Sequence, residues 1–294
     1  MLAGEYLNLW LDTFVRPFRA PSTAACYRRA IDALPPAVTA CDLADLDGMA
    51  IQASVNAQAR KHPRAAQLTF ATLHAALAKA VQLGYLDRHP MAACIRPAHK
   101  PRKAVVLTAP QLAAYIKAAR VEACFPLLLI IGTMGLRRSE ALGLTWACID
   151  LQQGLLSVHQ QRVRIAHRLQ LRPLKSSASN RVLPIPQPVA QELASCRADQ
   201  RIVSFSGWVF DTNPDTLRKA HLRTVERAAL PAVTLHGLRH SVATIAAAGG
   251  CPMKSLQGIL GHSKYELTAN LYADHMTAGD FAPHLAQLAS AVLG

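Results

Sequence analysis

Apolar residues recur at helical spacing over most of the first 83 residues, which predicts a series of amphipathic helices. Pro17 and the Pro35-Pro36 pair end the first two helices, because proline cannot continue a helix. Gly84 ends the last helix, since glycine readily adopts the left-handed conformation of a helix cap. We expect a four-helix unit made of Leu2–Val15, a helix that starts at Pro21-Ser22-Thr23, Asp42–Arg60 and Arg64–Leu83.

Proline and basic residues dominate the stretch that follows, as far as Lys103. Pro90, Pro97 and Pro101 stiffen it, and segments of this kind mark domain boundaries. We therefore expect an N-terminal helical domain over residues 1–88, a basic linker over residues 89–103, and a second domain over residues 104–294.

The second domain contains both the helical spacing of apolar residues and the alternation that is typical of strands. Thr108 and Gln111 have the spacing of a capping box for a helix through Arg120, and a buried helix should follow over Phe125–Ile131. Three short alternating stretches then predict an antiparallel sheet, and helices return from Val189, broken at Gly249-Gly250, Gly258 and Gly261. The predicted strands are Leu155–His159, Val163–Pro173 and Arg181–Ile185, with a polar turn at 175–180. The fold class is mainly α with a small antiparallel β-sheet, in two domains.

The composition is that of a folded protein, with 51% hydrophobic and 17% charged residues in 294. Its seven cysteines are scattered singly without a Cys-x-x-Cys pair, which argues for a reducing compartment and against structural zinc. The most apolar run, Ala123–Ile131, is too short to span a membrane, and the start of the chain lacks a basic secretory signal. We expect a cytoplasmic protein without a membrane partner.

The charge indicates a polyanionic partner. Lysine and arginine number 32 against 18 acidic residues, for a net charge of +14, and the excess is spread over both halves. A basic surface that only favours solubility is the alternative. The candidate DNA-phosphate contacts, each of which could instead be a solvated surface charge, are Arg28, Arg29, Arg60, Lys61, Arg64, Lys79, Lys100, Arg102 and Lys103.

Two motifs concentrate arginine and histidine. Arg239 follows His236 by three residues in His-Gly-Leu-Arg-His, so both side chains share a helical face, and Glu140 follows Arg137 at the same spacing. Fixed guanidinium groups suit phosphodiester chemistry, because charge accumulates on the non-bridging oxygens in the transition state. A metal half-site at the histidines and a surface ion pair at Arg137 are the alternatives, although no carboxylate or cysteine follows at a spacing that would complete the metal site.

Taken together, the motifs resemble the tyrosine recombinases, also called the phage integrase family. The resemblance rests on the order and spacing of Thr133-Met-Gly-Leu-Arg-Arg-Ser-Glu140, Lys175, His236-Gly-Leu-Arg-His240, Leu260-Gly-His-Ser263 and Tyr272. It covers the second domain nearly end to end. The four-helix unit, with its Pro-Ser-Thr-x-x-x-Tyr-Arg-Arg segment, resembles the core-binding domain of the same family.

The resemblance implies a catalytic role for six residues. Arg137 and Arg239 would clamp the phosphate, with His262 a further donor and His236 supporting the phosphate and proton movements. Lys175 would protonate the leaving 5′-oxygen, and Tyr272 would attack phosphorus to form a 3′-phosphotyrosine. Glu140 would support Arg137. The reaction implied needs neither a cofactor nor a metal.

The implied function is site-specific recombination that integrates or excises a mobile element such as a prophage. The partners would be double-stranded core-site DNA, three further copies in a DNA-bound homotetramer, and possible accessory DNA-bending or directionality proteins, with a monomer when free. A helix over Thr277–Gly294 would dock on a neighbouring protomer or pack in cis. A type IB topoisomerase and a non-catalytic DNA-binding protein with the same fold are the alternatives.

Three positions depart from the pattern of the family. Met134 stands where threonine is common, Gly237 where aspartate is common, and Cys148 where an acidic residue is usual. None of these differences removes a catalytic group. Nor does the sequence show a further DNA-binding domain before the four-helix unit, so regulation through distant arm sites is not expected.

Overall fold

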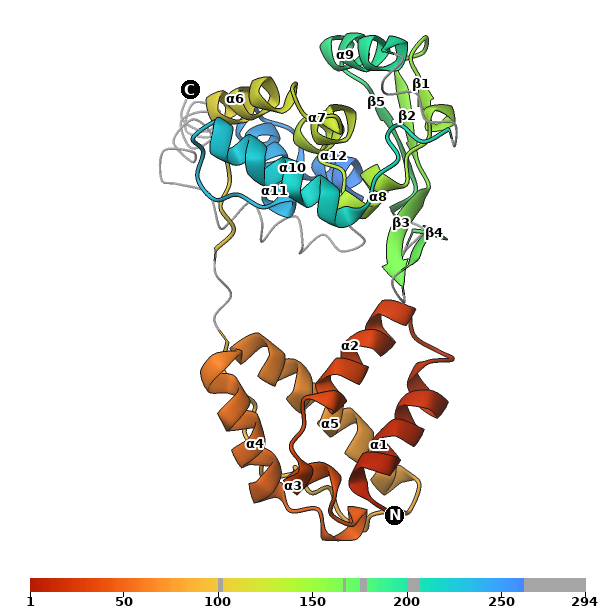
Figure 1. Ribbon diagram of the computed structural model, residues 1–294, viewed down its shortest axis with the longest axis vertical. Helices are drawn as coiled ribbons and strands as arrows, with labels where there is room; N and C mark the ends of the chain where they lie inside the picture. Colours follow the sequence, from red (N-terminus) through yellow and green to blue (C-terminus); the bar gives the residue numbers. More distant parts are fainter. Residues whose placement is uncertain (100–102, 166–167, 175–178, 200–206, 262–294) are drawn as a thin grey trace, which may run out of the picture. The chain divides into compact units, whose positions relative to one another are not determined.

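The computed structural model describes residues 1–99, 103–165, 168–174, 179–199 and 207–261. The chain divides into two compact units, Met1–Arg102 and Lys103–Gly294, and each has its own hydrophobic core (Figure 1). None of the helices in the described ranges is both long and apolar enough to cross a lipid bilayer.

The first unit is helical, as the sequence predicts. A π-helical turn over Leu11–Val15 prolongs α1, and a 3₁₀ turn over Leu43–Asp45 precedes α4. The helix α4 begins later than predicted, because Asp42 caps the 3₁₀ turn and Asp47 then caps α4 itself by accepting from the amide of Ala50 at 3.1 Å. The helices are α1 (Ala3–Trp10), α2 (Pro21–Asp32), the short α3 (Pro36–Thr39), α4 (Gly48–Lys61) and α5 (Pro63–Gln82).

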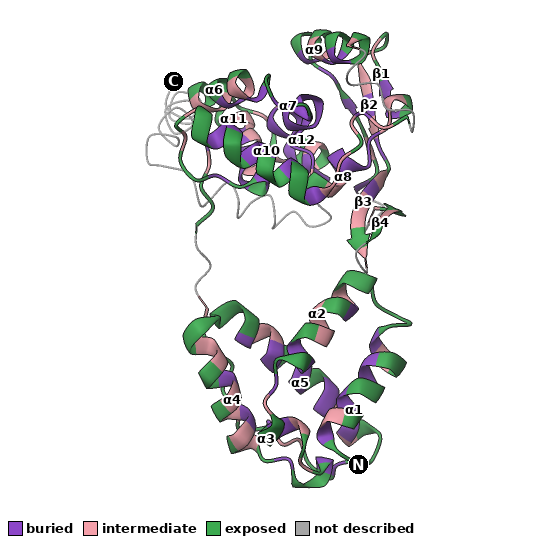
Figure 2. Cartoon of the chain, viewed as in Figure 1, coloured by how far each residue is buried: buried purple, intermediate pink, exposed green. Residues whose placement is uncertain are grey.

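Buried apolar side chains line the inner faces of these helices (Figure 2). The first part of the predicted linker shares this core. Met91 is buried there, the amide of Ile95 donates to Gln52 at 2.7 Å, and Gln67 donates to the carbonyl of Pro97 at 2.9 Å. The first unit therefore extends past residue 88, where the sequence suggests that the helical domain ends.

Helices form most of the second unit, with the strongly buried α7 near its centre (Figure 2). The predicted capping box of α6 is confirmed, since the amide of Thr108 donates to Gln111 at 2.9 Å and the amide of Gln111 to the Thr108 hydroxyl at 3.4 Å. Gly258 lies inside α12, so the break predicted there is wrong. The helices are α6 (Ala109–Ala119), α7 (Phe125–Met134), α8 (Arg138–Leu142), α9 (Gln187–Ala198), α10 (Pro214–Arg227), α11 (Leu235–Ala248) and α12 (Met253–Leu260).

Two small antiparallel sheets complete the unit. One has the order β1-β2-β5, and the other is the hairpin of β3 and β4, in which Gln160 pairs with Pro173. The prediction of a single strand over Val163–Pro173 is wrong, because the chain reverses between Ile165 and Arg168. No glycine, proline or asparagine marks that reversal in the sequence. The strands are β1 (Ile149–Asp150), β2 (Leu155–Val158), β3 (Gln160–Ile165), β4 (Arg168–Pro173) and β5 (Arg181–Pro184).

Gly237 lies at the start of α11, where this helix packs closely against the backbone of Val105. A Cβ atom at this position would lie 2.8 Å from the carbonyl oxygen of Val105 and 2.7 Å from a methyl carbon of Val233. The amide of Leu107 donates to the buried hydroxyl of Ser241 at 2.7 Å and holds the same segment against α11. The aspartate that is common in the family has no room here, so the departure follows from close packing.

A pair of glycine substitutions tests this packing. Gly237→Ala should lower the free energy of unfolding by about 1–3 kcal/mol, because the added methyl group forces the Val105 segment away from α11. Gly258→Ala is the control, since a Cβ in α12 meets nothing within 4 Å. It should raise stability by roughly 0.5–1 kcal/mol through helix propensity. Urea unfolding of the full chain measures both, and equal effects of the two substitutions would refute the packing argument.

Candidate active site

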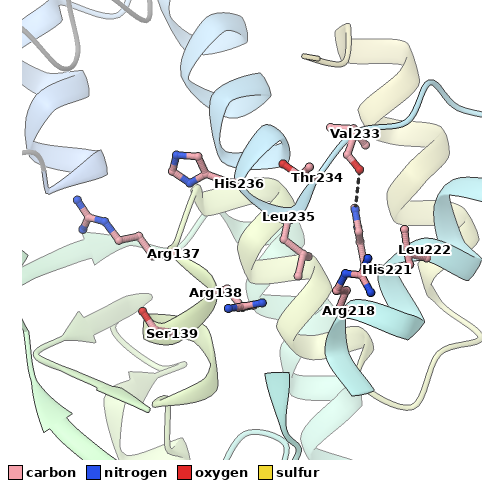
Figure 3. Close-up of a pocket in the computed structure, with 10 residues that line it drawn as sticks. All are labelled: Arg137, Arg138, Ser139, Arg218, His221, Leu222, Val233, Thr234, Leu235 and His236. Atoms are coloured by element: carbon pink, nitrogen blue, oxygen red, sulfur yellow. Dashed lines mark hydrogen bonds between the residues drawn. The ribbon is translucent and has the colours of Figure 1, made fainter. Parts of the chain in front are cut away.

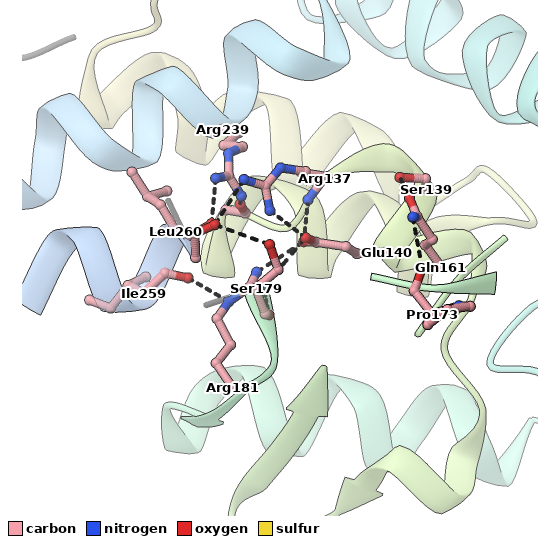
Figure 4. A network of polar contacts seen from close by, with 12 residues as sticks. Arg137, Ser139, Glu140, Gln161, Pro173, Ser179, Arg181, Arg239, Ile259 and Leu260 are labelled. Atoms are coloured by element: carbon pink, nitrogen blue, oxygen red, sulfur yellow. Dashed lines mark hydrogen bonds and ion pairs between the residues drawn. The ribbon is translucent and has the colours of Figure 1, made fainter. Parts of the chain in front are cut away.

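A buried carboxylate organises the predicted site. Glu140 lies on α8 with a side chain that is 1% exposed. Its oxygens accept from the amide of Arg137 at 2.9 Å, from Nη1 of Arg137 at 2.6 Å and from Nη2 of Arg181 at 2.9 Å (Figure 4). The prediction that Arg137 starts a helix and is oriented by Glu140 is therefore confirmed in its geometry. Arg137 is the N-cap of α8, and the Glu140 carboxylate accepts from both the backbone amide and the guanidinium of Arg137.

Three arginines hold three successive carbonyl groups at the end of α12. Arg181 donates through Nε to Ile259 at 2.8 Å, Arg239 donates through Nη2 to Leu260, and Arg137 donates through Nη2 to Gly261 at 2.9 Å. The last carbonyls of a helix lack partners within the helix and carry the negative end of its dipole. Through these hydrogen bonds, β5, α11 and the start of α8 all contact the end of α12 (Figure 4).

Two glycines in the left-handed conformation make this convergence possible. Gly135 ends α7 at φ +66°, and its carbonyl accepts from Nη1 of Arg239 at 2.7 Å. Gly261 ends α12 at φ +61°, and a Cβ atom there would lie 2.9 Å from Nη1 of Arg181. A side chain at either position would be strained by its backbone angle, and at Gly261 it would also displace a guanidinium.

The charges of the cluster do not cancel, because three guanidinium groups surround one carboxylate. Burial opposes the ionisation of Glu140, but the hydrogen bonds and charge of Arg181 and the hydrogen bonds of Arg137 outweigh it and hold the pKa of Glu140 below the ordinary value. Burial and the charge of Arg137 lower the pKa of Arg239 to about 9, so the group stays cationic at neutral pH. The cluster has a net positive charge and is suited to an anion.

Arg137 and His236 lie where the arginine cluster meets a cleft, and both line that cleft. The side chain of Arg137 is 33% exposed, whereas that of Arg181 is only 7% exposed. His236 lies on α11 one turn before Arg239, and its ring is 4.4 Å from that of His240 in an edge-on arrangement. Desolvation and the charges of Arg239 and Arg137 lower the pKa of His236, which favours the neutral imidazole. Both side chains line the same cleft (Figure 3).

Of the six residues predicted to be catalytic, the structure brings together Arg137, Arg239 and His236. Lys175, His262 and Tyr272 lie outside the described residues, so their roles stay predictions. His262 directly follows Gly261, whose carbonyl is bound by Arg137. In the part of the chain that the structure describes, no three histidine, cysteine or acidic side chains gather as a metal site.

The predicted DNA contacts on the first unit fall into two groups. Arg60, Lys61 and Arg64 are exposed at the turn between α4 and α5. Arg64 also donates to the Gln67 side chain at 3.4 Å. The others are less exposed or are held by the protein: Arg28 pairs with Asp32 at 3.6 Å, Arg29 donates to the Ala25 carbonyl at 3.3 Å, and the Lys79 ammonium lies 4.9 Å from the centre of the Phe14 ring. Lys103 is exposed, and Lys100 and Arg102 lie outside the described residues. The role of each of these residues in DNA contact remains a prediction.

Arg181 is the member of the arginine cluster that the sequence does not single out. In the sequence it is one of the basic residues that flank a polar turn, which is the usual pattern of a solvated surface. In the structure it is buried against Glu140 and bonded to Ile259 and to the carbonyl of Ser179 at 2.9 Å. Its contact with Glu140 joins residues that are distant in sequence, so the sequence alone does not reveal it.

Comparison with known proteins decides the family. The model of the phage integrase family matches residues 106–278, more than half of the chain. The chain belongs to the phage integrase family. Its resemblance to the tyrosine recombinases and its mainly helical fold with small antiparallel sheets are thereby confirmed.

Sequence relatives of this integrase-family chain include three curated proteins. A tyrosine recombinase XerC-like protein of Caldanaerobacter subterraneus subsp. tengcongensis is 31% identical over 183 residues, which cover 53% of this chain and 46% of that protein. The prophage integrase IntF of Escherichia coli is 29% identical, with 47% and 28% covered. The transposase from transposon Tn916 of Enterococcus faecalis is 28% identical, with 50% and 41% covered. The matches thus span less than half the length of each of these relatives.

Solved structures share the fold over nearly the whole chain. The integrase of transposon Tn1549, residues 82–397, in complex with a circular intermediate DNA superposes with a TM-score of 0.81 at 19% identity and covers 98% of this chain and 99% of that one. A lambda integrase dimer bound to a COC′ core site gives a TM-score of 0.74 at 19% identity, with 94% and 96% covered. At such identity the likeness shows the fold.

Removing Arg181 should destabilise this integrase-family fold. Arg181→Met leaves Glu140 buried with one partner, and breaking a buried ion pair costs about 3 kcal/mol. Arg164→Met is the matched control, because Arg164 pairs with Asp215 at the surface and such pairs contribute about 1 kcal/mol or less. Adding Glu140→Gln to Arg181→Met should cost less than the sum of the single changes, as urea unfolding will show. A loss at Arg181 equal to that at Arg164 would contradict the buried network.

Acid should destabilise the fold through His221. Its ring lies between the Tyr115 hydroxyl and the Val233 carbonyl, both at 2.9 Å, and burial lowers its pKa from the ordinary 6.5. As the pH falls, His221 therefore binds a proton in the unfolded chain before it does so in the folded chain. Its contribution to the free energy of unfolding is complete above pH 6.5 and is lost as the pH falls toward the lowered pKa. His221→Gln should reduce the slope of stability against pH between 6.5 and 5, by at most about 1.4 kcal/mol per pH unit. An unchanged slope would contradict this assignment.

Proposed function

We propose that this chain is a site-specific DNA recombinase that breaks and rejoins DNA strands through a 3′-phosphotyrosine at Tyr272, and that it integrates or excises a mobile element. The observation that carries the proposal is the arginine cluster on the last carbonyls of α12. It places the Arg137 guanidinium and the His236 imidazole, from segments distant in sequence, beside one cleft, and it holds the buried Arg239 guanidinium on the Leu260 carbonyl, two residues before His262. The family and its integrase and transposase relatives support the reaction class.

Arg137 retains exposed donors for a phosphate, whereas the spare donors of Arg239, which is 1% exposed, lie within the protein. A guanidinium has five N–H groups, and the contacts of each arginine within the protein use two nitrogens. The remaining N–H groups are pre-oriented by these contacts, so binding the non-bridging oxygens requires little further ordering. Such donors stabilise the negative charge that accumulates on those oxygens as the nucleophile attacks.

Proton movements would fall to the other predicted residues. Tyr272 attacks phosphorus and the 5′-oxygen leaves, taking a proton from the Lys175 ammonium. His236, held neutral by desolvation and by the two guanidinium groups, can accept a hydrogen bond or a proton from the nucleophile side. His262 adds a further donor to the phosphate. Reversal by a second 5′-hydroxyl restores the phosphodiester without ATP or a metal.

The partner that we propose is duplex DNA carrying recombination core sites. Lambda integrase has been solved as a dimer on a core site and as a tetramer on a Holliday junction. By analogy we propose a homotetramer on DNA and a monomer when free, with accessory DNA-bending or directionality proteins. The seven cysteines are free thiols, which supports a reducing compartment such as the cytoplasm.

A nicked suicide substrate tests the reaction. The duplex is built from the junction between the DNA carrying this gene and its flanking sequence, with a nick beside the cleavage position so that the released strand diffuses away. The natural chain should accumulate a covalent protein–DNA adduct, and Tyr272→Phe should form none. The absence of an adduct from the natural chain would favour a non-catalytic DNA-binding protein. Relaxation of supercoiled DNA without exchange between two sites would favour a type IB topoisomerase.

The arginine assignment has its own test. Arg137→Ala should slow adduct formation by roughly 10²–10³-fold while the dissociation constant for the duplex changes only a few-fold, because the guanidinium acts on the transition state. Arg164→Met serves as the control for removal of one exposed positive charge. A large loss of DNA affinity with unchanged chemistry at saturating DNA would overturn the assignment of Arg137.

A further inference from the structure

Beside the arginine cluster lies a cleft of about 450 Å³ with a basic lining of its own. Arg138 and Ser139, at the start of α8, form one wall, and Arg218 and Leu222 of α10 form the other (Figure 3). The segment 233–236 closes the space between them, and Arg137 belongs to both the cluster and the cleft. The cleft therefore continues the surface on which the reacting phosphate would lie.

Arg138 and Arg218 differ from the other arginines of this unit in their partners. Arg162 pairs with Asp211 at 2.6 Å, Arg164 pairs with Asp215, and Arg227 pairs with Glu122 at 3.1 Å. Within the described ranges, neither the Arg138 nor the Arg218 side chain makes a hydrogen bond or ion pair with the protein, and both residues are exposed. The hydrogen bond and charge of Arg164 lower the pKa of Asp215, and the charge of Arg138 adds to this effect without an ion pair to Asp215. Two cations thus face the cleft with their donors available.

The other described residues that line the cleft carry no negative charge that would repel an anion. None of the described residues that line it is acidic. His221 forms part of the lining, and its ring is fixed between the Tyr115 hydroxyl and the Val233 carbonyl. Ser139 donates to Gln161 at 3.1 Å, and the Thr234 hydroxyl accepts from the amide of Gly237 at 2.9 Å. The walls are held in place by these bonds, so among the described lining residues Arg138 and Arg218 are the charged groups, besides Arg137, that can meet a ligand.

We propose that Arg138 and Arg218 bind a second phosphate of the DNA strand, next to the one that Arg137 and Arg239 hold. A strand is the ligand that fits, because Arg137 belongs to both the cluster and the cleft, and a polyanion can occupy both positions at once. The proposal rests on the proposed function, since it takes the cluster as the place of the reacting phosphate. The subsite would fix the register of the strand, and neither arginine would take part in the chemistry.

Salt dependence of DNA binding tests the subsite. The full chain is titrated with a mixed-sequence duplex at increasing salt, alone and as Arg138→Gln/Arg218→Gln. Loss of one bound phosphate should reduce the slope of log K against log salt by about 1 and weaken binding roughly tenfold at fixed salt. The matched control is Lys117→Gln/Lys219→Gln, which removes the same two charges from exposed positions outside the cleft. It should change the slope by less than half as much.

The outcomes separate the subsite from the reaction. At saturating nicked core-site duplex, Arg138→Gln/Arg218→Gln should still form the covalent adduct at a rate within a few-fold of the natural chain. An equal slope change in both double variants would overturn the subsite and leave the recombinase proposal intact. A slope change confined to the cleft variant, with no adduct from the natural chain, would support the subsite and refute the reaction. Unchanged urea midpoints establish that each variant folds.

Discussion

The buried carboxylate of Glu140 is the interaction on which the second unit depends. A charge removed from water must be paired, and this one is shared by Arg137 and Arg181. Those arginines, together with Arg239, also bind the last carbonyls of α12, which would otherwise lack partners. One charge and its arginine partners thus join the start of α8 and β5 to the end of α12, which Arg239 of α11 also binds.

This arrangement connects stability with function. The groups proposed to bind a phosphate are held by contacts that also hold the fold together, so the site is ordered before DNA arrives. Arg239 is almost entirely buried, whereas Arg137 reaches the cleft, and the proposed second phosphate position extends from it along α8 and α10. The same local geometry requires glycine at 135 and 261, where the backbone is left-handed.

The sequence predicts those features that depend on local spacing. Helical periodicity, the capping box of α6 and the pairing of Arg137 with Glu140 all lie within a few residues of one another. It does not predict the reversal between β3 and β4, which lacks a turn residue, or the burial of Arg181, which depends on a contact with α8. The extension of the first unit to Pro97 likewise depends on hydrogen bonds to α4 and α5 rather than on local composition.

In the proposed reaction, Glu140 acts on the chemistry by orienting Arg137 and, through Arg181, the chain before His262. The single-turnover rate of adduct formation by Glu140→Gln at saturating nicked core-site duplex tests this role, because glutamine keeps the size of the side chain and removes its charge. We expect a rate reduced about 10- to 100-fold with DNA affinity unchanged, as for other partners that orient catalytic groups. A rate equal to that of the natural chain would contradict it.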